Sequence, residues 1–298
     1  MTPPVSAQGL SAPIPADPGL RPAPIASPSF TGSLAETEPE IKAVASAVAL
    51  TLTQYDAGET PGAIAARLRQ IGVDDPDLAR SLYVSGAAST GRIVYPQLGG
   101  LRPDTASVMT VIEQTLSTAE GVTTVSRTLD IRLRRIAGVW RFDTLASTGG
   151  EPPANPVPLS PAAIAVLDDT RIALPDSARW DIHAGAVSER LLSVMLRLAD
   201  FAPYGVITLV TGHPWEIFGT DRQSDHSRGL ALDVYRLSDR LVIEDRASGS
   251  LTHEAVRWLY SQPDIARIGS PWALDGFGGR SFTDALHQDH LHIAVIAD

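Results

Sequence analysis

The sequence contains no cysteine among its 298 residues. This absence excludes disulfide scaffolds, cysteine nucleophiles and thiolate zinc sites, so any metal must be held by histidine, aspartate or glutamate. Long apolar runs are also missing. The best one, residues 43–52, is interrupted by Ser46 and Thr51 and falls short of the roughly 20 residues that a membrane-spanning helix needs. The chain therefore has no predicted transmembrane segment.

Positive charge is scarce as well, with 24 lysines and arginines against 34 aspartates and glutamates and a net charge of −10. Non-specific nucleic-acid binding needs clustered positive charge, so the composition argues against a nucleic-acid partner. The start also lacks the charged and then apolar pattern of a secretory signal. A hydrophobic content of 44% is enough for a sizeable core, and the length suits two domains or one large one.

Two segments are predicted to lie outside folded domains. Residues 1–33 hold eight prolines and only Asp17 and Arg21 as charged residues, which favours an extended, mobile arm. In an envelope protein this arm would be a tether, and a plain disordered tail is the alternative. Residues 148–164 begin with TGGEPPANPVPLSP, a composition typical of a linker. The remaining parts, 34–147 and 165–298, are the two predicted domains.

The first predicted domain opens with helical spacing. Apolar residues between 41 and 52 fall on one helical face. Thr60, followed by proline, is a helix start signal, and this second helix is expected to end at Gly72. A third helix is expected over about 76–84. These segments predict a helical layer ahead of any sheet.

The same domain then changes to the period of two that is typical of strands. Alternation predicts strands near 108–116 and 129–133, and a turn at 137–138 leads into a strand at 139–142. Helices followed by an antiparallel meander predict an α+β domain. This order, with its closing Gly-Val-Trp-Arg-Phe hairpin, resembles the nuclear transport factor 2-like superfamily, in which helices close a curved sheet into a cone. No acid–base pair is evident here, so we expect a binding or spacer module whose ligand or partner is unknown.

The second predicted domain mixes helices and strands, which indicates a compact α+β fold. A helix is expected over 188–201, and Thr252 is expected to cap another. Strands are expected at three places: 205–210, 230–235 and 290–296.

Histidines are concentrated near the end of the chain. Of seven in all, three lie within six residues, namely His287, His290 and His292. His226 precedes Asp233 by seven positions, and small residues share the strand face of Asp233 and leave room beside it. Two imidazoles and a carboxylate that meet on a sheet suit Zn²⁺ with a fourth position open for water.

The remaining histidines, His183, His213 and His253, are interpreted as ordinary surface or core residues. A lone histidine is more often one of these than a metal ligand. His253-Glu254 begins like the helical H-E-x-x-H zinc motif, but position 257 is arginine, so that motif is absent.

Two motifs together resemble the D-alanyl-D-alanine metallopeptidase superfamily, which includes zinc D,D-carboxypeptidases, D,D-dipeptidases, phage endolysins and, by fold, the hedgehog signalling domain. The first motif, Ser-x-His-x-x-Gly-x-Ala-x-Asp, is filled at every fixed position: Ser224, His226, Gly229, Ala231 and Asp233. The second motif is the C-terminal His-x-His, filled by His290 and His292. The resemblance covers about residues 165–298.

The resemblance implies one zinc ion per chain with His226, Asp233 and His292 as its ligands. The catalytic base of this superfamily lies just before the last ligand, as a glutamate or as the first histidine of His-x-His. Position 289 is aspartate, so the sequence departs from the glutamate pattern. We expect His290 to be the base, with Asp289 as the alternative.

The same resemblance assigns substrate contacts to the segment before the first motif. Arg222 is the candidate for holding the substrate, through a terminal carboxylate or the oxyanion, although a solvated loop arginine is an equal alternative. Ser224 is expected to position the loop or to bind substrate. The implied activity is that of a zinc hydrolase, a carboxypeptidase or endopeptidase acting on a D-alanyl bond of peptidoglycan peptides. An extracytoplasmic location, in the cell envelope or secreted, goes with that substrate.

Two other hypotheses remain open. The C-terminal part could be a catalytically silent zinc-containing binding module of the cell envelope, as the hedgehog precedent shows. Alternatively, the first domain could be the functional one and hold a ligand in its cone. The peptidase hypothesis predicts that a chain lacking residues 1–150 still folds and binds zinc.

Overall fold

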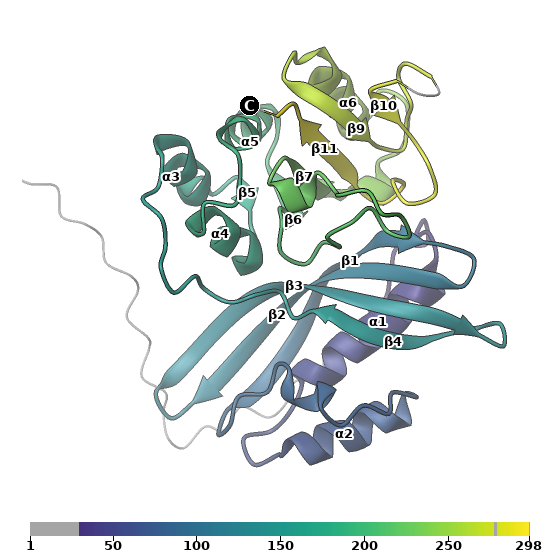
Figure 1. Cartoon of the computed structure of the whole chain (residues 1–298), viewed down its shortest axis with the longest axis vertical. Coiled ribbons are helices and arrows are strands. Elements are labelled where there is room, and N and C mark those ends of the chain that lie inside the picture. The colour runs from purple at the N-terminus through teal and green to yellow at the C-terminus, as the bar shows by residue number, and fades with distance from the viewer. Residues whose placement is uncertain (1–29, 277–278, 298) are drawn as a thin grey trace, which may run out of the picture.

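The computed structural model describes residues 30–276 and 279–297 (Figure 1). In these ranges the α-helices are α1 (Pro39–Thr53), α2 (Pro61–Gln70), α3 (Pro161–Asp168), α4 (Asp176–His183), α5 (Glu189–Phe201) and α6 (Leu251–Ser261). Short 3₁₀ turns lie at Leu78–Arg80, His226–Arg228 and Val242–Glu244.

In the part of the chain that the structure describes, the strands form a four-stranded and a seven-stranded sheet. The first sheet consists of β1 (Ala88–Leu101), β2 (Thr105–Thr118), β3 (Gly121–Ile136) and β4 (Val139–Ser147). The second consists of β5 (Ile172–Ala173), β6 (Tyr204–Thr208), β7 (Ala231–Leu237), β8 (Arg240–Leu241), β9 (Ile265–Gly269), β10 (Ser281–Phe282) and β11 (Leu291–Val295).

The four-stranded sheet is an antiparallel meander in chain order. The hairpin between β3 and β4 turns through Ala137 and Gly138, which both have positive φ, as tight hairpins require. Helix α1 lies across the outer face of this sheet (Figure 1). Ala106, Val108 and Ile112 of β2 contribute to the core on that side.

The seven-stranded sheet is mixed, with the order β10-β9-β11-β7-β6-β5 and with β8 paired to β7. Its central neighbours β7 and β11 are antiparallel. Helices α5 and α6 pack against it through a second core, to which Leu232 of β7 and Ile293 of β11 belong. This arrangement places the ends of β7 and β11 close to the four-stranded sheet (Figure 1).

A third cluster of buried side chains joins the two sheets. Tyr95, Met109 and Val111 of the first sheet pack against Ile207 and Tyr235 of the second. The rings of Tyr95 and Tyr235 stack, with centroids 5.3 Å apart and an interplanar angle of 15°. Residues 109 and 111 of β2 alternate with residues 108 and 112 of the outer core, so this strand is buried on both faces.

The α+β class predicted from the sequence is confirmed, because helices precede an antiparallel meander and a mixed region follows. The expected helices at 41–52, 60–72 and 188–201 correspond to α1, α2 and α5. The third expected helix, at 76–84, is wrong: only the 3₁₀ turn at Leu78–Arg80 forms there. Thr252 is not a helix cap either, since Ser250 accepts the capping hydrogen bond from His253 N.

Strand β1 is absent from the sequence-based expectations because its glycines and Pro96 are typical of turns. The sheet tolerates Pro96 because β1 is an edge strand. Gly100 is required by close packing, since a Cβ there would lie 2.1 Å from Cγ of Phe218. The expected linker also differs in part, because α3 begins at Pro161 with Ser160 as its cap.

The expected arm at 1–33 falls almost entirely outside the described residues. The described residues begin at residue 30, and their first regular element is α1 at Pro39, so the expected boundary at 33/34 stays a prediction. Among the helices that the structure describes, none has the length and apolar character needed to cross a membrane.

Candidate metal centre and its cavity

Two neighbouring strands in the middle of the larger sheet carry the central side chains. His292 of β11 lies directly opposite Asp233 of β7 in the antiparallel register. His226 lies on the 3₁₀ turn that leads into β7, and His290 immediately precedes β11. Since neighbouring strand residues point to opposite faces, Leu232 enters the core while Asp233 faces the other sheet.

Three atoms of these side chains form a nearly equilateral triangle. His226 Nε2 lies 3.1 Å from Asp233 Oδ1 and 3.1 Å from His292 Nδ1. His292 Nδ1 lies 3.1 Å from the same Asp233 oxygen. Ligands about 2 Å from a tetrahedral ion are about 3.3 Å apart, so the triangle matches the ligand spacing of one small cation. The structure thus brings together the three residues expected to bind metal.

A hydrogen bond on the far side of the His226 ring indicates which of its two nitrogens carries a proton. His226 Nδ1 lies 2.8 Å from the carbonyl oxygen of Leu209. A carbonyl only accepts, so Nδ1 carries a proton, and in the neutral imidazole Nε2 then keeps its lone pair. Metal-binding histidines typically donate their second nitrogen in this way. The donor set therefore fits a metal ion.

The first motif also shapes the backbone around His226. Gly229 ends the 3₁₀ turn with φ +68°, and a Cβ there would lie only 1.9 Å from the carbonyl oxygen of Ala186. Ser224 is buried, and its Oγ accepts a hydrogen bond from His226 N at 3.2 Å. The serine also lines the cavity described below. Both motif residues hold the turn that presents His226.

Burial and neighbouring charges act in opposite directions on these groups. Burial alone would raise the pKa of Asp233, but His226 and His290 hold that pKa well below its usual range. Burial lowers the pKa of His292 to about 4, although Asp233 opposes the shift. At neutral pH the site therefore presents a carboxylate and a neutral imidazole, the protonation states that bind metal.

A buried network orients His290. Its Nδ1 lies 2.7 Å from Asp289 Oδ1, and its Nε2 lies 3.9 Å from Asp233 Oδ2. Asp289 is fully buried, forms an ion pair with Lys42 of α1 at 2.6 Å and accepts a hydrogen bond from Leu98 N at 3.2 Å. Helix α1 and strand β1 thus hold the carboxylate that orients His290.

The two residues expected as alternative bases therefore differ in position. His290 lines the cavity, whereas Asp289 is not among the lining residues. Burial alone would raise the pKa of Asp289, but Lys42 and His290 lower it. Burial would lower the pKa of His290, but the carboxylates of Asp233 and Asp289 outweigh this effect and raise the pKa above its usual value. Asp289 is therefore the hydrogen-bond partner of His290, and His290 is the residue that faces the cavity.

Lys42 itself is fully buried and has a second acidic neighbour. It pairs with Glu36, and Tyr95 OH lies 3.2 Å from its Nζ. Burial raises the pKa of Glu36 despite the opposing effect of Lys42. The only lysine of the chain is therefore enclosed between two carboxyl groups, one from each part of the fold.

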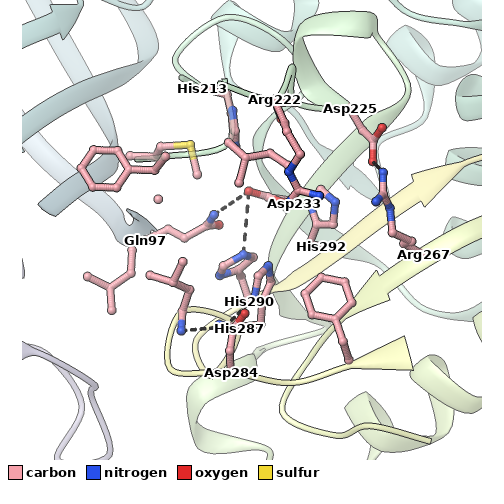
Figure 2. A pocket seen from close by; sticks show the side chains of 18 of the residues that line it. Gln97, His213, Arg222, Asp225, Asp233, Arg267, Asp284, His287, His290 and His292 are labelled. Atoms are coloured by element: carbon pink, nitrogen blue, oxygen red, sulfur yellow. Dashed lines mark hydrogen bonds and ion pairs between the residues drawn. The ribbon is translucent and has the colours of Figure 1, made fainter. Parts of the chain in front are cut away.

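The side chains around the triangle line a cavity of about 570 Å³ between the two sheets (Figure 2). Gln97, Leu98, Gly99 and Met109 come from the four-stranded sheet, and the metal-site residues come from the larger one. The candidate site is therefore built at the contact between both sheets.

Arg222 lies on the loop before the first motif and lines the cavity, as expected. Its side chain is exposed and extends toward the cavity centre (Figure 2). Another arginine of the cavity lining, Arg267, already forms an ion pair with Asp225 at 2.6 Å. Arg222 is thus positioned to meet an anionic group of a ligand.

His213, interpreted from the sequence as an ordinary residue, lies at the site. Its ring stacks on His226 with centroids 4.1 Å apart and an interplanar angle of 15°. Burial holds the pKa of His213 well below its usual range. His213, His226 and Asp233 offer ligand atoms within 4.8 Å of one another, so this group could hold a metal ion. The sequence signal that could have indicated this position is that His213 follows β6, the strand that pairs with β7.

Two further residues of the cavity were not singled out by sequence reasoning. His287 is oriented by Asp284, whose Oδ1 lies 2.7 Å from His287 Nδ1. Gln97 of β1 donates from Nε2 to Asp233 Oδ2 at 2.5 Å (Figure 2). The membership of His287 in the histidine cluster was a usable signal. Nothing in the sequence near Gln97 indicates the contact, because 136 positions separate the two residues.

Comparisons with protein-family models, curated proteins and solved structures found no match.

Replacing Gly229 by alanine is expected to destabilise the fold by about 2–4 kcal/mol, because the new Cβ meets a positive φ and a backbone oxygen. Urea unfolding measures this loss. Gly249→Ala is the matched control, since Gly249 has φ +81° but nothing within 4 Å of its Cβ position. Equal losses in both variants would contradict the steric explanation.

Replacing Lys42 by methionine leaves Asp289 as a buried carboxylate without its cation, which is expected to cost about 3–5 kcal/mol. Combining it with Asp289→Asn is expected to recover about 1–3 kcal/mol relative to the sum of the single losses. Chemical unfolding of the four proteins measures this coupling. Additive losses would show that the pair is not coupled.

Proposed function

We propose that this protein is a zinc-dependent peptidase that hydrolyses a D-alanyl bond in peptidoglycan-type peptides, with residues 165–298 as its peptidase domain. The observation that carries the proposal is the triangle of His226 Nε2, Asp233 Oδ1 and His292 Nδ1 beside a cavity. The substrate class rests on the resemblance of the two motifs to D-alanyl-D-alanine metallopeptidases. An extracytoplasmic location follows from that substrate.

When bound by these three residues, zinc would supply a Lewis acid and a water of lowered pKa. His290 is the residue placed to move protons. Because its Nδ1 is engaged by Asp289, Nε2 is the nitrogen that faces Asp233 and the cavity. In its neutral form, His290 would accept the proton of the attacking water at Nε2 and return it to the leaving amine.

Arg222 has the chemistry to orient the peptide. A guanidinium binds a carboxylate through paired hydrogen bonds, so the terminal carboxylate of a D-alanyl peptide is its natural partner. The exposed position of Arg222 at the cavity leaves the guanidinium accessible to such a group. Such a contact would favour the carboxypeptidase form of the activity over the endopeptidase form.

The purified protein is expected to contain about one zinc ion per chain, and Asp233→Ala is expected to lose it, because the carboxylate supplies both charge and one ligand. Elemental mass spectrometry measures the metal content. Asp239→Ala, in the exposed turn after β7, is the matched control and should retain zinc. A wild-type protein that takes up no zinc would overturn the peptidase proposal.

His290→Gln is expected to keep its zinc while the turnover number for peptides ending in D-alanyl-D-alanine falls by about 10²–10⁴, the usual contribution of a general base. Release of D-alanine measures turnover. His183→Gln, at the half-buried C-terminal end of α4 and outside the cavity lining, serves as control. Zinc binding without any turnover by the wild type would indicate the catalytically silent binding module instead.

A further inference from the structure

Gln97 lies at an unusual place for a polar side chain. It sits on β1, fully buried, while its neighbours at the contact between the sheets are the aromatic and apolar residues Tyr95, Met109 and Val111. Its partner across the β1–β2 ladder is Met109. A buried amide at such a position costs stability unless its hydrogen bonds are satisfied.

The chemistry of Asp233 determines how the Gln97 amide is oriented. An ionised carboxylate only accepts hydrogen bonds, so the NH₂ group must face Asp233 Oδ2, at 2.5 Å. Among the described residues the opposite end, Gln97 Oε1, is buried without a hydrogen-bond partner. The amide thus makes one strong contact and leaves one acceptor unsatisfied, an arrangement that an apolar side chain would avoid.

That one contact is made to the oxygen of Asp233 that does not face the two histidines. Oδ1 lies 3.1 Å from both His226 Nε2 and His292 Nδ1, whereas Oδ2 receives the amide. Holding Oδ2 fixes the rotation of the carboxylate, so that Oδ1 stays in the triangle. Groups that orient metal ligands in this way commonly change metal affinity by 10- to 100-fold when removed.

We propose that Gln97 is a positioning residue of the metal centre, so that the four-stranded sheet is part of the site rather than a separate binding or spacer module. The inference deepens the proposed function and rests on its zinc site. It predicts that zinc affinity depends on a side chain 136 positions away from Asp233, on the other sheet.

Zinc affinity of the full-length protein tests this inference without any assay of activity. Competition with a fluorescent zinc chelator is expected to show about tenfold weaker binding or more for Gln97→Met, which fills similar space but donates nothing. Gln97→Glu is the second variant, because it keeps the shape and replaces the NH₂ group by oxygen. We expect Gln97→Glu to bind zinc at least as weakly as Gln97→Met does.

A matched control separates positioning from general damage to the sheet. Gln114 is also a buried glutamine on the four-stranded sheet, but its amide donates to Leu82 O at 2.9 Å and to Ser89 Oγ at 3.0 Å. It does not line the cavity. Gln114→Met should lower the melting temperature and leave zinc affinity unchanged.

Cobalt provides a spectroscopic readout of the same idea. The visible absorption of the Co²⁺-loaded protein depends on ligand geometry, so it is expected to change in Gln97→Met and to stay as in the wild type in Gln114→Met. A role for Gln97 in filling space alone would leave this spectrum unchanged.

The outcomes are distinct. Wild-type zinc affinity and an unchanged cobalt spectrum in both Gln97 variants would overturn the inference, and so would an equal loss of affinity in Gln114→Met. If the wild type binds zinc but cleaves no peptide, the proposed activity fails while the zinc affinities still decide the role of Gln97. If the wild type binds neither zinc nor cobalt, both proposals are overturned.

Discussion

The buried carboxylate of Asp233 is the constraint on which the rest of the site depends. A charge removed from water needs compensating groups, and Asp233 has two imidazoles at 3.1 Å on one oxygen and an amide at 2.5 Å on the other. These partners come from three separate parts of the chain. Folding must therefore bring β1, β7 and β11 together before this charge is satisfied, which ties the site to the packing of the whole molecule.

A second buried charge has the same effect at the edge of the site. Asp289 lies between His290, which faces the cavity, and Lys42, which belongs to α1. Together with the stacked Tyr95 and Tyr235, this ion pair joins the four-stranded sheet to the larger one. The expectation that residues 151–298 fold and bind zinc alone stays a prediction. In that shortened chain, Asp289 would lack Lys42 and Tyr235 would lack Tyr95.

Local pattern was sufficient for much of the fold. Helices α1, α2 and α5 and the β3–β4 hairpin follow from spacing, caps and turn residues, because these signals act between neighbours in the chain. Pattern failed at β1, where glycines and Pro96 reflect edge pairing and close packing against Phe218. It failed also at 76–84, where only a 3₁₀ turn forms.

The division between sequence and tertiary structure is sharpest at the candidate metal centre. Strand alternation and two short motifs were enough to single out His226, Asp233 and His292. Alternation places Asp233 and His292 on a defined strand face, and the first motif places His226 on the turn before β7. His213, Gln97 and Lys42 reach the same centre from other elements, so no local spacing relates them to it. The packing of the two sheets decides the contacts of Gln97 and Lys42, and the pairing of β6 with β7 decides that of His213. Burial of apolar faces, rather than sequence distance, determines which strands become neighbours.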